Sequence, residues 1–217
     1  MATSTISPAS PDSATGRKAT AHVVVIAASA GGIDALRTVL GGLPADFPAP
    51  VVIVLHRTPG RESLFASIFK RDSALPVKDA VEGESIAPGT VYLAPADHHL
   101  TLDREGRMVF SERLKISYGR AAADPLFESA AEAYGPRAVG VVLSGGGRSG
   151  ATGAKAIHDV GGTVIAQDQA TSRHFSMPRA AIDAGAVTNV LPIDRIAEQL
   201  TQLMKPSESV PPANPEE

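Results

Sequence analysis

Residues 27–32, Ala27-Ala28-Ser29-Ala30-Gly31-Gly32, lie between an apolar run at residues 22–26 (HVVVI) and a segment at residues 33–40 (IDALRTVL) with helically spaced apolar residues. This pattern predicts a strand that passes through a turn into a helix, because Ala and Gly have little or no side chain to obstruct a sharp turn. Ser29 would then lie at the helix N-terminus, where unpaired N–H groups and the helix dipole favour negative charge. A nucleophilic serine needs such an environment, since an oxyanion forms beside it during acyl transfer. The simpler alternative is that Ser29 only caps the helix.

The composition is that of a globular protein built on one main domain. The chain has 217 residues, of which 43% are apolar and 20% charged, and its net charge of −3 gives no basic surface for nucleic acid. It has no cysteine, which excludes disulfides, cysteine-ligated zinc and thiol nucleophiles. The N-terminus has no secretory signal, and no apolar run is long enough to span a bilayer. We therefore expect a soluble, cytoplasmic protein with no integral membrane segment.

Strand and helix patterns alternate along the chain. We expect disordered tails at residues 1–21 and 205–217, which lack the apolar residues needed for folding, and one domain at residues 22–204. Short runs at residues 77–80, 91–94, 99–102 and 107–110 indicate hairpins or antiparallel strands. Together these patterns predict an α/β fold with a doubly wound, mostly parallel sheet and a small antiparallel β insertion. The other predicted strands are residues 23–27, 51–56, 138–143 and 163–167, and the predicted helices are residues 33–40, 63–70, 124–134, 153–160, 177–184 and 193–204.

Polar residues follow several of the predicted parallel strands. In doubly wound folds, ligands bind beyond the carboxyl ends of the strands, and Ser29, His56, the loop at residues 145–150 and Asp168 all fall there. An imidazole at position 56 could accept the Ser29 proton, because both side chains would project from the same edge of the sheet. The alternative for His56 is a solvated histidine at a strand end.

Two further motifs suggest other chemistries. Gly145-x-Gly147-x-x-Gly150 follows a predicted strand and matches the dinucleotide-binding pattern, with Asp168 where a ribose-binding acid would lie. The match makes a dinucleotide-binding oxidoreductase an alternative function. The late position of the motif in the chain argues against it, and the loop could instead supply backbone N–H groups to a site shared with Ser29. Residues 97–99 (DHH) suggest a metal, but adjacent extended residues point to opposite faces and no further ligand follows at a suitable spacing. We predict no metal site and no cofactor.

Several stretches together resemble the catalytic domain of CheB-type chemotaxis protein-glutamate methylesterases. Residues 28–32 (ASAGG) are similar to the nucleophile turn of that family, usually Gly-x-Ser-Thr-Gly-Gly, and His56 falls where the family has its catalytic histidine. The resemblance covers residues 22–203 and implies a Rossmann-like parallel sheet and a Ser-His-Asp triad. It also implies hydrolysis of glutamate methyl esters, and deamidation of glutamines, on a chemoreceptor or another signalling protein. The remaining similar stretches are residues 81–84 (VEGE), 87–95 (APGTVYLAP) with His99, 124–127 (DPLF), 166–168 (AQD) and 177–182 (MPRAAI).

The chain departs from the family pattern at the acid of the triad. The family has Gly-Met-Gly-x-Asp-Gly-Ala, whereas residues 145–151 here are GGGRSGA, with Ser149 in the acid's place. Loss of the triad acid lowers kcat by on the order of 10⁴-fold in serine proteases. The nearest substitute acid by topology is Asp168. A second expected departure is the lack of the receiver domain that usually precedes the family's catalytic domain.

The resulting hypothesis is a serine hydrolase with an atypical triad. Ser29 would attack an ester carbonyl and His56 would act as general base and then acid. The alternative is an inactive relative that binds a partner through the same cleft. The backbone N–H groups expected to hold the oxyanion are those of Ala30, Gly31, Gly146 and Gly147.

Overall fold

The structure is a computed structural model that describes residues 21–56, 62–111 and 122–205. Almost all of the two predicted tails therefore lies outside the described residues. The helices are α1 (Gly32–Gly42), α2 (Glu62–Asp72), α3 (Asp124–Tyr134), α4 (Ala151–Asp159), α5 (Ser176–Asp183) and α6 (Ile193–Leu203), with a 3-10 turn η1 (Gly135–Arg137). The strands are β1 (Val23–Ala28), β2 (Val51–Leu55), β3 (Val77–Asp79), β4 (Val91–Leu93), β5 (His99–Leu102), β6 (Met108–Ser111), β7 (Ala138–Val142), β8 (Thr163–Gln167) and β9 (Asn189–Leu191).

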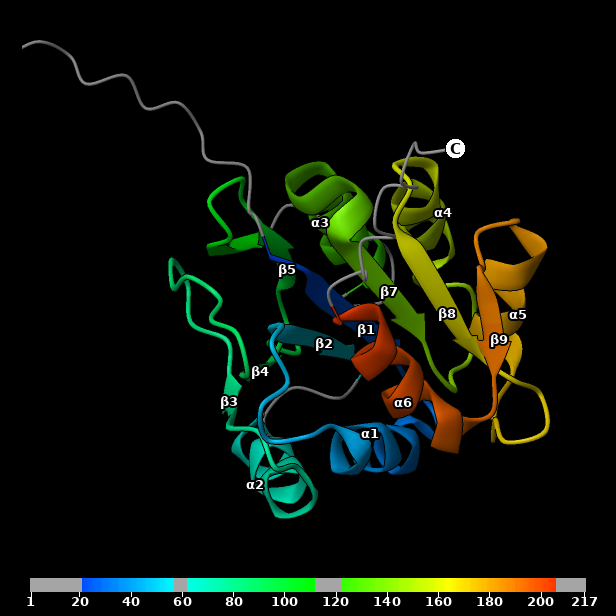
Figure 1. The fold of residues 1–217 in the computed structure, drawn as a ribbon, viewed down its shortest axis with the longest axis horizontal. Coiled ribbons are helices and arrows are strands. Elements are labelled where there is room, and N and C mark those ends of the chain that lie inside the picture. The colour runs from blue at the N-terminus through cyan, green and yellow to red at the C-terminus, as the bar shows by residue number, and fades with distance from the viewer. Residues whose placement is uncertain (1–20, 57–61, 112–121, 206–217) are drawn as a thin grey trace, which may run out of the picture.

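The main sheet is parallel throughout and has the strand order β3-β4-β2-β1-β7-β8-β9 (Figure 1). A separate antiparallel hairpin is formed by β5 and β6. The predicted fold class, a doubly wound sheet with a small antiparallel insertion, is confirmed. After β1 the chain forms β2, β3 and β4 on one side of it, with β4 between β2 and β3, and then β7, β8 and β9 on the other side. The order thus reverses between β1 and β7, which is where ligands bind in folds of this type.

The prediction of antiparallel strands at residues 77–80 and 91–94 is wrong. These residues form β3 and β4, which pair in parallel with each other, and β4 also pairs in parallel with β2. Short apolar runs indicate burial but not a pairing partner, and β4 is buried on both faces as central parallel strands are. Strand β9 was not predicted at all, since it has three residues and exposes Val190 at the edge of the sheet.

The alternation of buried side chains along β1 divides the core into two layers. Val23, Val25 and Ala27 face one layer, with α3, α4, α5 and the β5–β6 hairpin, and the intervening residues face the other, with α1, α2 and α6. Continuous burial of β1 and β2 on both faces explains their uninterrupted apolar sequences. Among the described residues, no helix is long and apolar enough to cross a bilayer.

Candidate active site at the carboxyl edge of the sheet

Ser29 lies directly beyond β1, in the turn that leads into α1. Its N–H donates to the carbonyl of Ser144 (3.0 Å), and its own carbonyl accepts from the N–H of Gly32 (2.8 Å). The N-cap of α1 is Gly31, which has a left-handed φ of 74° and no side chain to cap the helix. Ser29 is therefore not the capping residue, contrary to the simpler interpretation of the sequence. Its side chain is partly exposed just ahead of the positive end of α1.

His56 occupies the corresponding position beyond the neighbouring strand β2. Ala28 and Leu55 form the last pair of the β1–β2 register, and the His56 N–H donates to the carbonyl of Ala28 (3.0 Å). Ser29 and His56 are thus the next residues on two parallel strands that lie about 4.8 Å apart. The Nε2 atom of His56 is buried. The candidate nucleophile and base thus follow neighbouring strands at one edge of the sheet. The residues that follow His56, 57–61, lie outside the described part of the chain.

Gly145 and Met177 lie on the side of Ser29 away from His56, since Gly145 follows β7 and His56 follows β2. A Cβ at Gly145 would lie 2.9 Å from the Ser29 Cβ and 2.1 Å from the Met177 Sδ, so only glycine fits. Gly145 also donates to the carbonyl of His174 (2.9 Å) and accepts from the N–H of Met177 (3.0 Å). Neither Met177 nor His174 was predicted as a site residue; the similarity of residues 177–182 to the family pattern was the signal that pointed to this segment.

The four backbone groups predicted to hold the oxyanion lie in the two loops that follow β1 and β7. Ala30, Gly146 and Gly147 are exposed, and a Cβ at Gly146 or Gly147 would meet nothing within 4 Å. Within the described residues, no group accepts a hydrogen bond from the N–H of these three residues or of Gly31. Backbone N–H groups without an acceptor are candidates to hold a tetrahedral oxyanion.

Ser149 lies on the α3–α5 side of the sheet. Its Oγ accepts a hydrogen bond from the N–H of Ala123 (3.0 Å), directly ahead of α3. The next residue, Gly150, is the N-cap of α4 with φ of 89°, and a Cβ there would lie 3.4 Å from the Ala27 Cβ of β1. Ser149 is thus placed beside the strand that carries Ser29, but as a neutral group with one lone pair already in use.

The glycine-rich loop does not present a free anion site at the N-terminus of α4. The carboxylate of Asp124 accepts from the N–H of Gly150 (3.1 Å) and of Gly153 (2.9 Å), where the pyrophosphate of a dinucleotide would bind. The structure therefore does not support the alternative of a dinucleotide-binding oxidoreductase.

Asp168 is not brought to His56. Its Oδ1 accepts from the N–H (2.9 Å) and the Oγ1 (2.6 Å) of Thr171, which closes a local turn. Strand β8 is separated from β2 by β7 and β1, which places the ends of β8 and β2 roughly 14 Å apart. The structure thus gives no support to Asp168 as a substitute for the triad acid.

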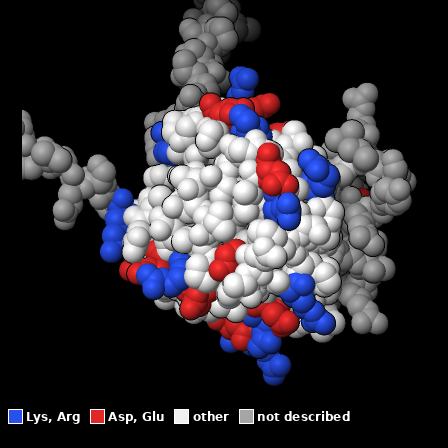
Figure 2. Space-filling view, turned by 90° about the vertical axis from the view of Figure 1, so that its right-hand side faces the viewer, with Lys and Arg blue, Asp and Glu red and all other residues white. Residues whose placement is uncertain are grey.

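The histidine-containing stretch at residues 97–99 is taken up by local contacts. The Nδ1 of His98 lies 2.8 Å from a carboxylate oxygen of Asp97, and the buried His99 accepts the N–H of Ala122 at its Nδ1 (3.0 Å). No group of three or more potential ligands converges anywhere in the described residues. On the face that Figure 2 shows, Lys and Arg side chains are interspersed with Asp and Glu and form no continuous basic surface.

Fold and site together define a doubly wound α/β protein with a serine beside the point where its strand order reverses and a histidine beyond the neighbouring strand. Comparisons with known proteins assign the family. A model of the CheB methylesterase family matches residues 24–200, so this chain belongs to that family.

Curated relatives and a solved structure agree with this assignment. A protein-glutamate methylesterase/protein-glutamine glutaminase 2 of Anaeromyxobacter dehalogenans is 45% identical over 89% of this chain and 57% of its own length. The protein-glutamate methylesterase FrzG of Myxococcus xanthus is 42% identical over 83% of this chain and 54% of its own. The crystal structure of the Thermotoga maritima CheB methylesterase catalytic domain superimposes with a TM-score of 0.83 at 38% identity, covering 85% of this chain and all of that one. The chain thus spans about half the length of these curated relatives.

Proposed function

We propose that this chain is a protein-glutamate methylesterase that hydrolyses glutamate γ-methyl esters, and deamidates glutamines, on cytoplasmic segments of chemoreceptor-type proteins. The observation that carries this proposal is that Ser29 and His56 are the first residues beyond two neighbouring strands, β1 and β2. The N–H groups of Ala30, Gly31, Gly146 and Gly147, which have no acceptor among the described residues, support it. Membership of the CheB methylesterase family and the names of the relatives support the choice of substrate.

The reaction follows the serine-hydrolase pattern. The Ser29 hydroxyl attacks the ester carbonyl while His56 accepts its proton, and the N–H groups of Ala30 and Gly146, with those of their neighbours, stabilise the oxyanion. Collapse of the tetrahedral intermediate expels methanol, protonated by His56, and leaves an acyl-enzyme. Water, activated by His56, then releases the glutamate carboxylate and regenerates Ser29.

Ser149 sets the expected rate. A carboxylate at this position would fix the imidazole tautomer and stabilise the imidazolium that forms in each step. A serine hydroxyl accepts a hydrogen bond but carries no charge, and the Oγ of Ser149 already accepts the Ala123 N–H. We therefore expect turnover well below that of an enzyme with a complete triad.

The test is methanol release from a methylated chemoreceptor segment. We expect Ser29→Ala and His56→Ala each to lower release far below the wild-type rate, leaving only what the oxyanion hole and substrate binding supply. Ser85→Ala, an exposed serine away from the site, should retain the wild-type rate. Equal rates for the wild type and Ser29→Ala would overturn the proposal. If both proteins then still bound the methylated segment with equal affinity, the chain would instead be an inactive member of the family that binds its partner.

A further inference from the structure

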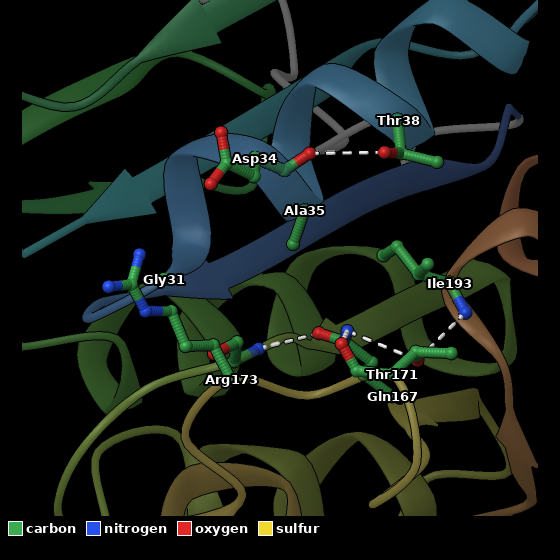
Figure 3. Close-up of a pocket in the computed structure, with 9 residues that line it drawn as sticks. Gly31, Asp34, Ala35, Thr38, Gln167, Thr171, Arg173 and Ile193 are labelled. Carbon is green, nitrogen blue, oxygen red and sulfur yellow. Dashed lines mark hydrogen bonds between the residues drawn. The ribbon is translucent and has the colours of Figure 1, made fainter.

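A pocket of about 230 Å³ with both polar and apolar walls adjoins the nucleophile turn at the reversal of strand order (Figure 3). It lies between the first turns of α1 and α6 and the loop that follows β8. Gly31, two residues after Ser29, forms part of its wall, and Asp34, Thr38, Gln167, Thr171 and Arg173 supply the polar side chains around it. A group bound here would lie beside an ester held at Ser29.

The inner wall of the pocket is fixed by hydrogen bonds. The Gln167 side chain accepts the N–H of Ser144 (2.8 Å) and donates to the carbonyl of Thr171 (3.0 Å). The Ser144 hydroxyl donates to the carbonyl of Ala30 (2.8 Å) and accepts the N–H of His174 (3.0 Å). These groups have their partners within the protein, so recognition depends on the charged residues at the rim.

Arg173 is the cation at that rim. A Cβ at Gly31 would lie 2.8 Å from the Arg173 Cβ and 3.3 Å from its Cδ, so the arginine stem lies directly on the glycine of the nucleophile turn. In Figure 3 its guanidinium points past Gly31, away from Gln167 and Thr171. Within the described part of the chain, no carboxylate lies within ion-pair distance of Arg173.

The other charged residue of the pocket, Asp34, is differently situated. It lies one turn before Arg37 on α1, but Arg37 pairs mainly with Asp72 (2.6 Å) and interacts only weakly with Asp34. Arg173 and the N-terminus of α1 both contribute positive potential beside Ser29, and Asp34, in the first turn of α1, offsets part of it. A planar guanidinium in this setting is suited to a carboxylate.

Resting on the proposed function, we propose that Arg173 determines substrate choice by binding an acidic side chain of the substrate protein, next to the esterified glutamate. The pocket holds the acidic side chain while Ser29 attacks the ester. Asp34, on the α1 wall of the pocket, repels the negative charge of that side chain. Arg173 acts here as a binding residue and takes no part in bond making or breaking.

The experiment uses two synthetic peptides that carry one glutamate γ-methyl ester, flanked either by glutamates or by glutamines. For the acidic peptide, we expect Arg173→Ala to raise KM on the order of tenfold with little change in kcat, as for loss of one charge-assisted hydrogen bond. Asp34→Asn should lower KM for the same peptide, because it removes a like charge. Arg179→Ala is the matched control, since Arg179 is exposed and pairs only with Asp183 on its own helix among the described residues.

With the glutamine-flanked peptide, Arg173→Ala and the wild type should have the same KM. An equal increase of KM for both peptides, or no increase for either, would overturn the proposal. Affinity measured by fluorescence anisotropy in a Ser29→Ala background separates this proposal from the proposed function. If the wild type releases no methanol, the function fails, but a loss of affinity on Arg173→Ala confined to the acidic peptide would still support the role of Arg173.

Discussion

Ser149 is the residue on which the proposed rate of this enzyme depends most. Its Oγ accepts the N–H of Ala123 at the start of α3. An aspartate at this position has two carboxylate oxygens, so one can accept that N–H while the other remains for an imidazole N–H. We expect Ser149→Asp to raise kcat for methyl-ester hydrolysis by several orders of magnitude, up to about 10⁴-fold.

The control for this prediction is Ser149→Asn. Asparagine has nearly the same shape as aspartate and can also accept the Ala123 N–H, but it carries no charge to stabilise an imidazolium. We expect no comparable gain from it. Methanol release by the two variants, measured side by side, shows whether a negative charge at position 149 raises kcat. Equal rates would show that charge at this position does not limit the reaction.

Gly145 is required by the close packing around the nucleophile. A methyl group at this position would overlap the Met177 Sδ (2.1 Å) and crowd the Ser29 Cβ (2.9 Å). We expect Gly145→Ala to lower the free energy of unfolding by about 1–3 kcal/mol through overpacking and to displace Ser29. Gly146→Ala is the matched control for stability, because its Cβ would enter open space. Urea denaturation of both variants checks this, and similar midpoints would contradict it.

At the scale of elements, α3 and α4 stabilise each other's N-termini. Ser149, just before α4, accepts the N–H of Ala123, and Asp124, the first residue of α3, accepts the N–H groups of Gly150 and Gly153. Neither helix has a cap from its own N-cap side chain. The packing of α3 on α4 therefore holds the loop that carries Gly146 and Ser149 in place beside β1.

The carboxylate of Asp124 is the stronger of these reciprocal caps. We expect Asp124→Ala to lower the free energy of unfolding by about 1–2 kcal/mol, because two N–H groups and the positive end of α4 lose their partner. Asp124→Asn should cost less, since the amide oxygen keeps one hydrogen bond. Asp194→Ala serves as the control, because Asp194 lies in the first turn of α6 but is exposed. Urea denaturation giving equal losses at positions 124 and 194 would contradict the capping role.

These contacts also show why the sequence predicted some elements and not others. The apolar patterns located β1, β2, β7 and β8 and thus placed Ser29 and His56 at one edge. They did not identify Asp124 as a cap for α4, because ordinary capping signals lie within a few residues of the helix, whereas Asp124 precedes Gly150 by 26 residues. Asp168 was predicted as a substitute for the triad acid because it also follows a parallel strand, and the ends of such strands share one edge of the sheet. The sequence does not show how many strands separate two such residues, here β7 and β1 between β8 and β2.

Over the whole molecule, ionisable groups outside the site set how stability varies with pH. Hydrogen bonds from Arg37 to Asp72 and from Lys155 to Asp159 lower the pKa of the two carboxyl groups. The stability that these carboxylates contribute is present above about pH 4 and is lost as pH falls through their pKa values in the folded protein.

Burial, aided by the charge of Arg137, lowers the pKa of His22, so the fold loses stability as pH falls below about 6.5. Burial raises the pKa of Glu128 and works in the opposite sense. Asp72, Asp159 and His22 therefore each contribute to a loss of stability in acid.

The alkaline limb depends on Tyr134, at the end of α3. Burial, together with the charge of Asp103, raises the pKa of this phenol from 10.0 to about 12. The unfolded chain ionises first as pH rises, so stability present below pH 10 is lost between pH 10 and about 12, by at most about 2–3 kcal/mol. Tyr134→Phe cannot ionise and should remove this share of the loss. Urea denaturation of wild type and variant at about pH 8 and about pH 11 measures it; if both proteins lost the same free energy of unfolding between the two, the alkaline limb would have to arise from other groups.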